Sequence, residues 1–394
     1  MQDINTLLTE IAWPLTLLLA WIAGEFVHQR LKLPKISVYA LIGFGLSGHS
    51  LGWLSTEQSP NMLLLANIAF GLILFECGYR FNIFWIRKNL WLTTASVVEA
   101  TVTFGAVYLL FSWIGQPAVP SLMIASLAMA TSPATVLRVI NEQKSSGQVT
   151  ERILHLSVLN CLLAVFSFKV IVGWLVFQTS GNLLSATYSS VLVLCASLLL
   201  GSVAGALVST LLRALHRVTQ DSTLVFTMAV VLVVSIAHSL KLSPVLAALT
   251  FGVMARHQRI ALSASQRGFG ALGDLMSILL FVYVAATVSW HSVVVGFSLG
   301  ATIIVVRQVV KIATLGAFAR VSGISWRKGF LVGVATAPMS AFVILMLEQT
   351  RHLGIQLLDQ LPALVTGALL MEILGPLLVQ YALMLAKESH SSKE

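Results

Sequence analysis

Two proline-containing segments decide the fold of this 394-residue chain: Ala-Thr-Ser-Pro at 130–133 and Ala-Thr-Ala-Pro at 335–338. Each interrupts a long apolar stretch. Proline removes a backbone N–H donor and disfavours the helical conformation in the residue before it. Both segments therefore predict a broken helix with free carbonyl groups at the break. For either segment alone, a simple kink is the alternative interpretation.

The composition places nearly the whole chain in a membrane. Hydrophobic residues make up 57% and charged residues 10%, with a mean hydropathy of +0.90. A soluble protein carries about 25% charged residues, so a soluble protein is excluded. We expect one transmembrane domain over 1–394, with no soluble regulatory domain. The net charge of +9 is expected to orient the chain and contact anionic lipid, and it does not indicate a nucleic-acid partner.

Apolar stretches of about 20 residues, separated by polar loops, predict about thirteen transmembrane helices. Their approximate limits are 7–27, 36–54, 60–79, 89–114, 117–140, 150–178, 185–212, 221–240, 242–256, 269–287, 290–318, 328–348 and 358–386.

The positions of Lys and Arg test this number of helices independently. With the N-terminus outside, nineteen of the 24 basic residues fall in alternate loops on the cytoplasmic side. Only Lys241 and Arg351 fall in external loops, and Lys169, Arg307 and Lys311 lie within helices. Because cytoplasmic loops carry an excess of Lys and Arg, thirteen helices are predicted, with the N-terminus outside and the C-terminus inside.

The two proline segments also indicate an internal repeat. Helices one to six, about 7–178, then correspond to helices eight to thirteen, about 221–386, and 185–212 connects them. Seven helices, an odd number, separate corresponding elements, so the halves are inverted in the membrane. Inverted repeats with interrupted helices at matching positions indicate the binding site of a secondary transporter. We therefore expect the two broken helices to cross.

Ionisable side chains within the helices are candidate site residues, because each costs about 2.5–3.5 kcal/mol on insertion scales. Arg307 and Lys311 are four residues apart, so they share a helix face and are expected to point toward one or more acids. Buried ion pairs that only fix helix packing are the alternative for any single residue. Together with the broken helices, the set predicts an ion or proton pathway. It comprises Glu76, Glu99, Glu372, Lys169, Arg307 and Lys311.

The three cysteines do not indicate a disulfide or a metal site. Cys77, Cys161 and Cys195 all lie in apolar runs without metal-ligand spacing. The sequence therefore predicts no metal and no cofactor.

Several of these segments resemble the monovalent cation/proton antiporter superfamily, which includes sodium/hydrogen exchangers and Kef-type potassium transporters. Leu74-Phe75-Glu76 followed by Gly78 resembles the exchangers' Phe-Glu-Gly-Gly-Leu, and 130–133 resembles their Ala-Thr-Asp-Pro. The segment 157–160 resembles part of Glu-Ser-Leu-Leu-Asn-Asp, and 372–376 resembles a bacterial Kef-type branch. The resemblance implies an all-α sodium/proton antiporter-like fold with crossed discontinuous helices, forming a homodimer in the bacterial inner membrane.

Three carboxylates of the family pattern are missing from this chain. Cys161 replaces the aspartate after the asparagine, Ser132 replaces that of Thr-Asp-Pro, and Leu156 replaces the glutamate before the asparagine. A neutral thiol is a weak cation ligand, so the transport carboxylate is expected elsewhere. Glu76 is the first candidate, with Glu99 and Glu372 in reserve. The other expected ion- or proton-binding residues are Thr131, Ser132, Ser157, Asn160, Cys161 and Thr336, with Arg307, Lys311 and Lys169 compensating charge.

The resemblance implies exchange of a monovalent cation, Na⁺ or K⁺, for protons, with one carboxylate binding either ion. Two alternatives keep the same fold: a transporter of an organic or anionic solute, and a homologue that does not transport. A membrane-embedded enzyme is disfavoured, because the sequence contains neither an HExxH motif nor an Asp-rich loop.

Overall fold

The computed structural model is helical almost throughout. It describes residues 2–48, 52–54, 60–180, 183–214, 222–258, 262–349 and 361–389. Within these ranges, the β-structure is an isolated bridge between Ser47 and Leu54, and nine helical segments are long and apolar enough to cross a membrane. The predicted all-α polytopic membrane fold is confirmed. Arg351, predicted to be external, lies outside the described residues.

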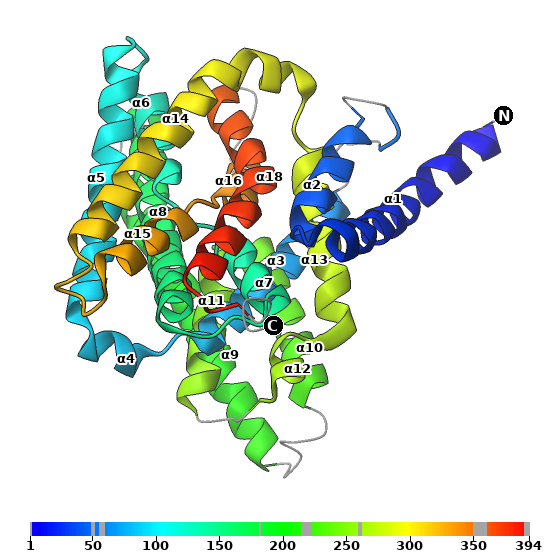
Figure 1. Ribbon diagram of the computed structural model, residues 1–394. Helices are drawn as coiled ribbons and strands as arrows, with labels where there is room; N and C mark the ends of the chain where they lie inside the picture. The colour runs from blue at the N-terminus through cyan, green and yellow to red at the C-terminus, as the bar shows by residue number, and fades with distance from the viewer. Residues whose placement is uncertain are drawn as a thin grey trace. The chain divides into compact units, whose positions relative to one another are not determined.

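The helices follow most of the predicted transmembrane segments (Figure 1), but the segment predicted at 36–54 is helical only as far as Gly45. The segments 117–140 and 328–348 each form two short helices, and α4 and α12 are additional short helices. The described helices are α1 (Gln2–Leu31), α2 (Lys35–Gly45), α3 (Pro60–Arg80), α4 (Ile83–Lys88), α5 (Leu90–Trp113), α6 (Ala118–Ala128), α7 (Pro133–Glu142), α8 (Gln148–Ser180), α9 (Leu183–Ala214), α10 (Ser222–Ser239), α11 (Pro244–His257), α12 (Ala264–Arg267), α13 (Gly270–Ala286), α14 (Trp290–Ala317), α15 (Trp326–Ala335), α16 (Ser340–Gln349) and α18 (Pro362–Leu385).

The chain divides into two compact units. The first comprises Met1–Ser59, Asn89–Cys161 and Ile278–Glu394. The second comprises Pro60–Lys88 and Leu162–Ser277. Helices α8 and α13 each have one part in the first unit and one part in the second.

In the first unit, α14 packs along α5, α15 and α18 (Figure 1). The buried residues of α14 recur every three or four positions, from Gly296 through Gly300 and Ile303 to Arg307 and Lys311. This spacing places them on one face of the helix. The missing side chain of Gly300 allows close approach, because a Cβ there would lie 2.7 Å from the Ala363 carbonyl oxygen on α18. The two charged residues of α14 therefore point into this unit.

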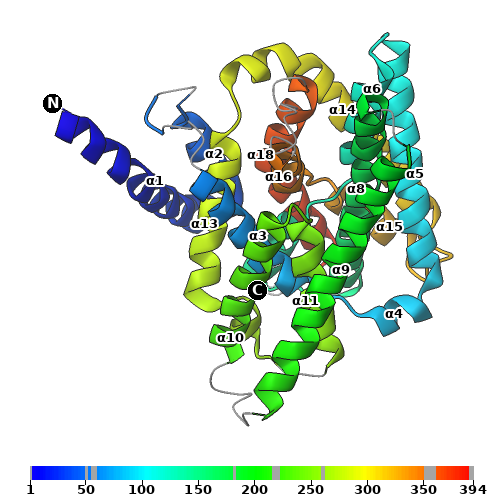
Figure 2. The same ribbon diagram turned by 180° about the vertical axis from the view of Figure 1, so that it is seen from behind.

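In the second unit, α11 packs against α3 and α9, and α10 covers α3 (Figure 2). The crossing of α3 and α11 depends on glycine on both helices. A Cβ on Gly78 would lie 2.2 Å from the Leu249 carbonyl oxygen, and one on Gly252 would lie 2.1 Å from that of Phe75. Neither position has space for a larger side chain.

The two proline segments break their helices and meet in the first unit. Between α6 and α7, Ser132 caps the new helix, and Pro133 begins it. The Thr131 hydroxyl donates to the Thr336 carbonyl oxygen at 3.2 Å, across 205 residues of sequence. The Ser132 N–H donates to the Pro338 carbonyl oxygen at 2.7 Å. These bonds confirm the predicted crossing of two discontinuous helices.

Candidate ion-binding site

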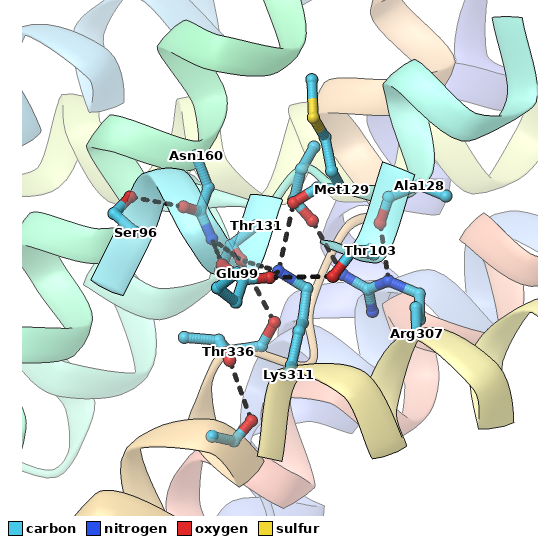
Figure 3. Close-up of polar contacts among 12 residues, drawn as sticks. Ser96, Glu99, Thr103, Ala128, Met129, Thr131, Asn160, Arg307, Lys311 and Thr336 are labelled. Atoms are coloured by element: carbon cyan, nitrogen blue, oxygen red, sulfur yellow. Dashed lines mark hydrogen bonds and ion pairs between the residues drawn. The ribbon is translucent and has the colours of Figure 1, made fainter. Parts of the chain in front are cut away.

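A buried ion pair lies beside the crossed breaks. Lys311 on α14 donates from Nζ to Glu99 Oε1 on α5 at 2.5 Å (Figure 3). The same ammonium group donates to the Met129 carbonyl oxygen at 3.1 Å and to the Thr131 hydroxyl at 3.2 Å. Glu99, Thr131 and Lys311 are all fully buried. The ammonium group therefore has three oxygen acceptors, two of which come from the break between α6 and α7.

Asn160 on α8 joins the carboxylate to the same break. Its Nδ2 donates to Glu99 Oε2 at 2.6 Å and to the Thr131 hydroxyl at 3.3 Å (Figure 3). Its Oδ1 accepts from Ser96 at 2.8 Å, which fixes the orientation of the amide. The Thr103 hydroxyl donates to Glu99 Oε1 at 3.2 Å. Both oxygens of Glu99 thus have donors, as a buried carboxylate requires.

Arg307 holds the two breaks together through their backbone. Its Nε donates to the Ala128 carbonyl oxygen at 2.9 Å, and its Nη2 donates to that of Ala130 at 2.7 Å. Its Nη1 donates to the carbonyl oxygen of Ala337 in the other break. The guanidinium group supplies donors to carbonyls that the interrupted helices leave without intrahelical partners. Sequence reasoning placed Arg307 opposite an acid, whereas the acceptors of its three hydrogen bonds are main-chain oxygens.

The remaining predicted neutral ligands lie at or near this cluster with different partners. Thr336 contributes its carbonyl oxygen, while its hydroxyl donates to Gly333 at 2.8 Å. The Ser132 hydroxyl accepts from Thr135. The Ser157 hydroxyl donates to the Leu154 carbonyl oxygen at 2.8 Å, and Cys161 is a buried free thiol. Of the predicted side-chain ligands, Thr131 and Asn160 touch the ion pair directly.

The two other predicted residues on α3 and α8 belong to the second unit. Glu76 on α3 is buried and pairs with Arg80, one turn later, at 2.9 Å. Lys169 on α8 is half-buried. The structure therefore does not place the first-choice carboxylate in the same unit as Asn160 and Thr131. It places Glu99, a reserve candidate, against both.

Three contributors to the cluster were not predicted: Ser96, Thr103 and the Met129 carbonyl oxygen. Ser96 and Thr103 lie three residues before and four residues after Glu99. Ser96, Glu99 and Thr103 are therefore on one face of α5. This stripe of polar residues on an apolar helix was a signal available in the sequence.

The oxygens around the Lys311 ammonium group are of kinds that also bind metal cations. Carboxylate, hydroxyl and carbonyl oxygens are ligands that hard cations prefer. Here they surround the ammonium group of Lys311. The described residues contain no group of three or more His, Cys, Asp or Glu side chains arranged to hold a metal ion.

Comparison with known proteins identifies the family. Residues 15–384 match the family described as "Sodium/hydrogen exchanger, transmembrane". The chain belongs to this family.

One curated relative is the ammonium/H(+) antiporter subunit AmhT of Alkalihalophilus pseudofirmus. It is 26% identical over 292 residues, which cover 70% of each protein. Two solved structures of the sodium proton antiporter MjNhaP1 from Methanocaldococcus jannaschii share the fold. One has a TM-score of 0.69 at 13% identity and covers 98% of both chains. The other, from electron microscopy, has a TM-score of 0.70 at 15% identity, covering 96% of this chain and 97% of that one.

Family membership confirms the resemblance seen in the sequence and supports cation/proton antiport as the function. It does not favour transport of an organic solute or a non-transporting role.

Proposed function

We propose that this protein exchanges a monovalent cation for protons at a site formed by Glu99, Lys311, Thr131, Asn160 and the Met129 carbonyl oxygen. The observation that carries the proposal is the position of the Lys311 ammonium group. It is a cation held by a carboxylate, a hydroxyl and a carbonyl oxygen in a fully buried site beside two helix breaks.

Competition for these oxygens couples the two ions. When a cation binds Glu99, Met129 and Thr131, the Lys311 side chain gives up its place and its proton. One positive charge enters the site as one leaves it. The group formed by Glu99, Lys311 and the cation keeps the same net charge in both states, so exchange at this pair moves no net charge. Exchange then follows because the Lys311 ammonium group and the transported cation cannot occupy the same ligands at the same time.

The oxygen ligands of the site indicate which cations it could bind. Na⁺ and K⁺ are the expected substrates, because a carboxylate with neutral oxygens suits both. Ammonium is a further candidate, because Lys311 already fills the site with an N–H donor to each of three oxygens. A relative is named as an ammonium/H(+) antiporter subunit, so ammonium belongs among the cations tested.

The test is dissipation of a pH gradient in proteoliposomes that contain the purified protein. Na⁺, K⁺, Li⁺ and ammonium are added in turn, and protein-free liposomes correct for permeation of ammonia. At least one cation is expected to dissipate the gradient, and Glu99→Gln is expected to abolish that response. Glu76→Gln is the matched variant, because it removes a buried carboxylate that pairs with Arg80 instead. Full activity of Glu99→Gln would overturn the assignment, and loss in Glu76→Gln alone would transfer it to Glu76.

We also infer the orientation of the exchanger in the membrane, its internal repeats and its oligomeric state. The alternation of basic loops supports an N-terminus in the periplasm and a C-terminus in the cytoplasm of a bacterial inner membrane. The contact of Thr131 with Thr336 supports inverted repeats over about 7–178 and 221–386, joined by 185–212 within one transmembrane domain. The Kef-type motif at 372–376 and the homodimer rest on the family resemblance. Cross-linking in native membranes tests the dimer, and a monomer alone would exclude it.

A further inference from the structure

Glu372 is a buried carboxyl group outside the cluster around Glu99. It lies in the middle of α18 and is 0% exposed. Neither of its side-chain oxygens has a hydrogen-bond partner among the described residues. An ionised carboxylate in such a place lacks both water and a donor, which strongly disfavours its charge. Burial without a hydrogen-bond donor therefore favours the neutral, protonated form of this carboxyl group.

No charged group on the helices packed against α18 neutralises Glu372 in the described structure. These helices are α2, α7, α14, α15 and α16. Their charged side chains form hydrogen bonds or ion pairs with other groups or, for Arg138 and Glu348, make no hydrogen bond to Glu372. These other contacts are Arg307 with backbone carbonyls, Lys311 with Glu99, Lys35 with Glu25, Glu142 with His28, Arg327 with the Leu385 carbonyl oxygen, and Lys328 with Gln148 and Glu388.

The main chain around Glu372 lacks one helical hydrogen bond, although α18 is continuous there. Pro376 lies inside α18, and its missing N–H would otherwise bond to the Glu372 carbonyl oxygen. Gly375, one turn after Glu372, packs against the break between α15 and α16. A Cβ on Gly375 would lie 3.1 Å from Pro338, whose carbonyl oxygen accepts from Ser132. Glu372 thus shares a helix face with the residue that contacts the crossed breaks.

We propose that Glu372 carries a second proton in the transport cycle. The inference rests on the exchange proposed at Glu99. In the conformation described here, Glu372 holds its proton while Lys311 occupies the ion site. When a cation displaces Lys311, Glu372 also releases its proton, to water on the side toward which the breaks open. The cation then travels with two carboxylates, and each cycle exchanges two protons for one cation.

The ligand at Glu372 is a proton rather than a second metal cation. A monovalent cation needs several oxygen ligands, and among the described residues no polar group forms a hydrogen bond with this carboxyl group. A proton needs one oxygen. Release of this proton leaves Glu99 and Glu372 both ionised with one bound cation, so one net charge crosses the membrane in each cycle. A single-proton exchange at Glu99 and Lys311 moves no net charge.

The coupling ratio tests this directly. Proteoliposomes are clamped at zero membrane potential with a tenfold proton gradient, and the cation gradient that stops net flux is measured. Two protons per cation require a balancing gradient of about 100-fold, and one proton requires about tenfold, because gradient free energies are logarithmic. The wild type is expected at the higher value, and Glu372→Gln at the lower. Glu25→Gln is the control for loss of a carboxylate, since Glu25 pairs with Lys35, and it is expected to keep the wild-type ratio.

A second measurement covers variants that fold but do not cycle. Protons released on cation binding are counted with a pH indicator in detergent, with Glu372→Met as an additional variant that introduces no unpaired polar group. Both Glu372 variants are expected to release one proton fewer than the wild type. Unchanged proton release, or loss of cation binding in both, overturns the inference. A wild type with active one-to-one exchange also overturns it, whereas a wild type without any cation/proton exchange refutes the proposed function itself.

Discussion

The ion pair between Glu99 and Lys311 makes a quantitative prediction about stability. Glu99→Gln leaves the Lys311 ammonium group buried with two neutral acceptors, Met129 and Thr131. Lys311→Met leaves the Glu99 carboxylate with two neutral donors, Asn160 and Thr103. Breaking a buried pair by removing one partner costs about 3–5 kcal/mol, whereas replacing both charges is often neutral. We expect about 3 kcal/mol from each single variant, because Lys311 can lose its proton in Glu99→Gln and Glu99 can gain one in Lys311→Met.

The double variant is expected within about 1 kcal/mol of the wild type, which gives a coupling energy of about 5 kcal/mol between the two sites. Reversible unfolding in mixed micelles titrated with sodium dodecyl sulfate measures each free energy. The transport assay separates stability from function, because the double variant regains stability without regaining exchange. Additive effects of the single substitutions would refute the reasoning, since they would mean that the two groups do not sense each other's charge.

Two further substitutions test the supports of the site. Arg307→Lys keeps the charge but cannot reproduce bonds to the carbonyls of Ala128, Ala130 and Ala337 together. We expect it to lower the free energy of unfolding by about 2–4 kcal/mol in the same titration, because a hydrogen bond to a charged group contributes about 1.5–3 kcal/mol. An unchanged free energy of unfolding would contradict the proposal that Arg307 holds the two breaks together. Glu388→Gln weakens the cap that its carboxylate forms on the N–H groups of 149 and 150 at the start of α8. The first turn of α8 is expected to lose about 1 kcal/mol of stability. This loss would appear as faster hydrogen exchange at those two amides, while the number of protons exchanged per cation stays the same. Exchange rates equal to those of the wild type would exclude the cap.

The sequence was sufficient to predict the breaks and their crossing. Proline chemistry at 130–133 and 335–338 predicted both interruptions, and the odd number of helices between them predicted inversion. The hydrogen bond between Thr131 and Thr336 confirms that the breaks meet, and the inversion of the two halves stays a prediction. These features could be predicted because they depend on local backbone chemistry and on hydrophobic patterning, both of which are written directly in the chain.

The choice among the acids depended on packing that the sequence does not show. Glu76 and Glu99 are both single acids in apolar helices. Glu76 has Arg80 one turn later, a local ion pair that i,i+4 spacing indicates and the structure contains. Glu99 meets Lys311 only because α5 packs on α14, across 212 residues of sequence. The partners of Arg307 were equally hidden, since backbone carbonyls leave no mark in the sequence.

The position of Glu99 gives a physical account of the missing family aspartate. The exchanger pattern carries a carboxylate directly after the asparagine, where this chain has the buried thiol of Cys161. Asn160 itself is retained, and its amide bridges Glu99 to Thr131 at the break. In this chain the carboxylate next to that amide therefore comes from α5, whereas in the family pattern it comes from the helix that carries the asparagine. One carboxylate balances the ammonium group of Lys311. A carboxylate at 161 would place a second acid directly after Asn160, whose amide already donates to Glu99. If Glu99 is the transport carboxylate as proposed, we expect Glu99 and an aspartate at 161 to be alternatives for one role, so Cys161→Asp in a Glu99→Gln background is the substitution with which to look for restored exchange.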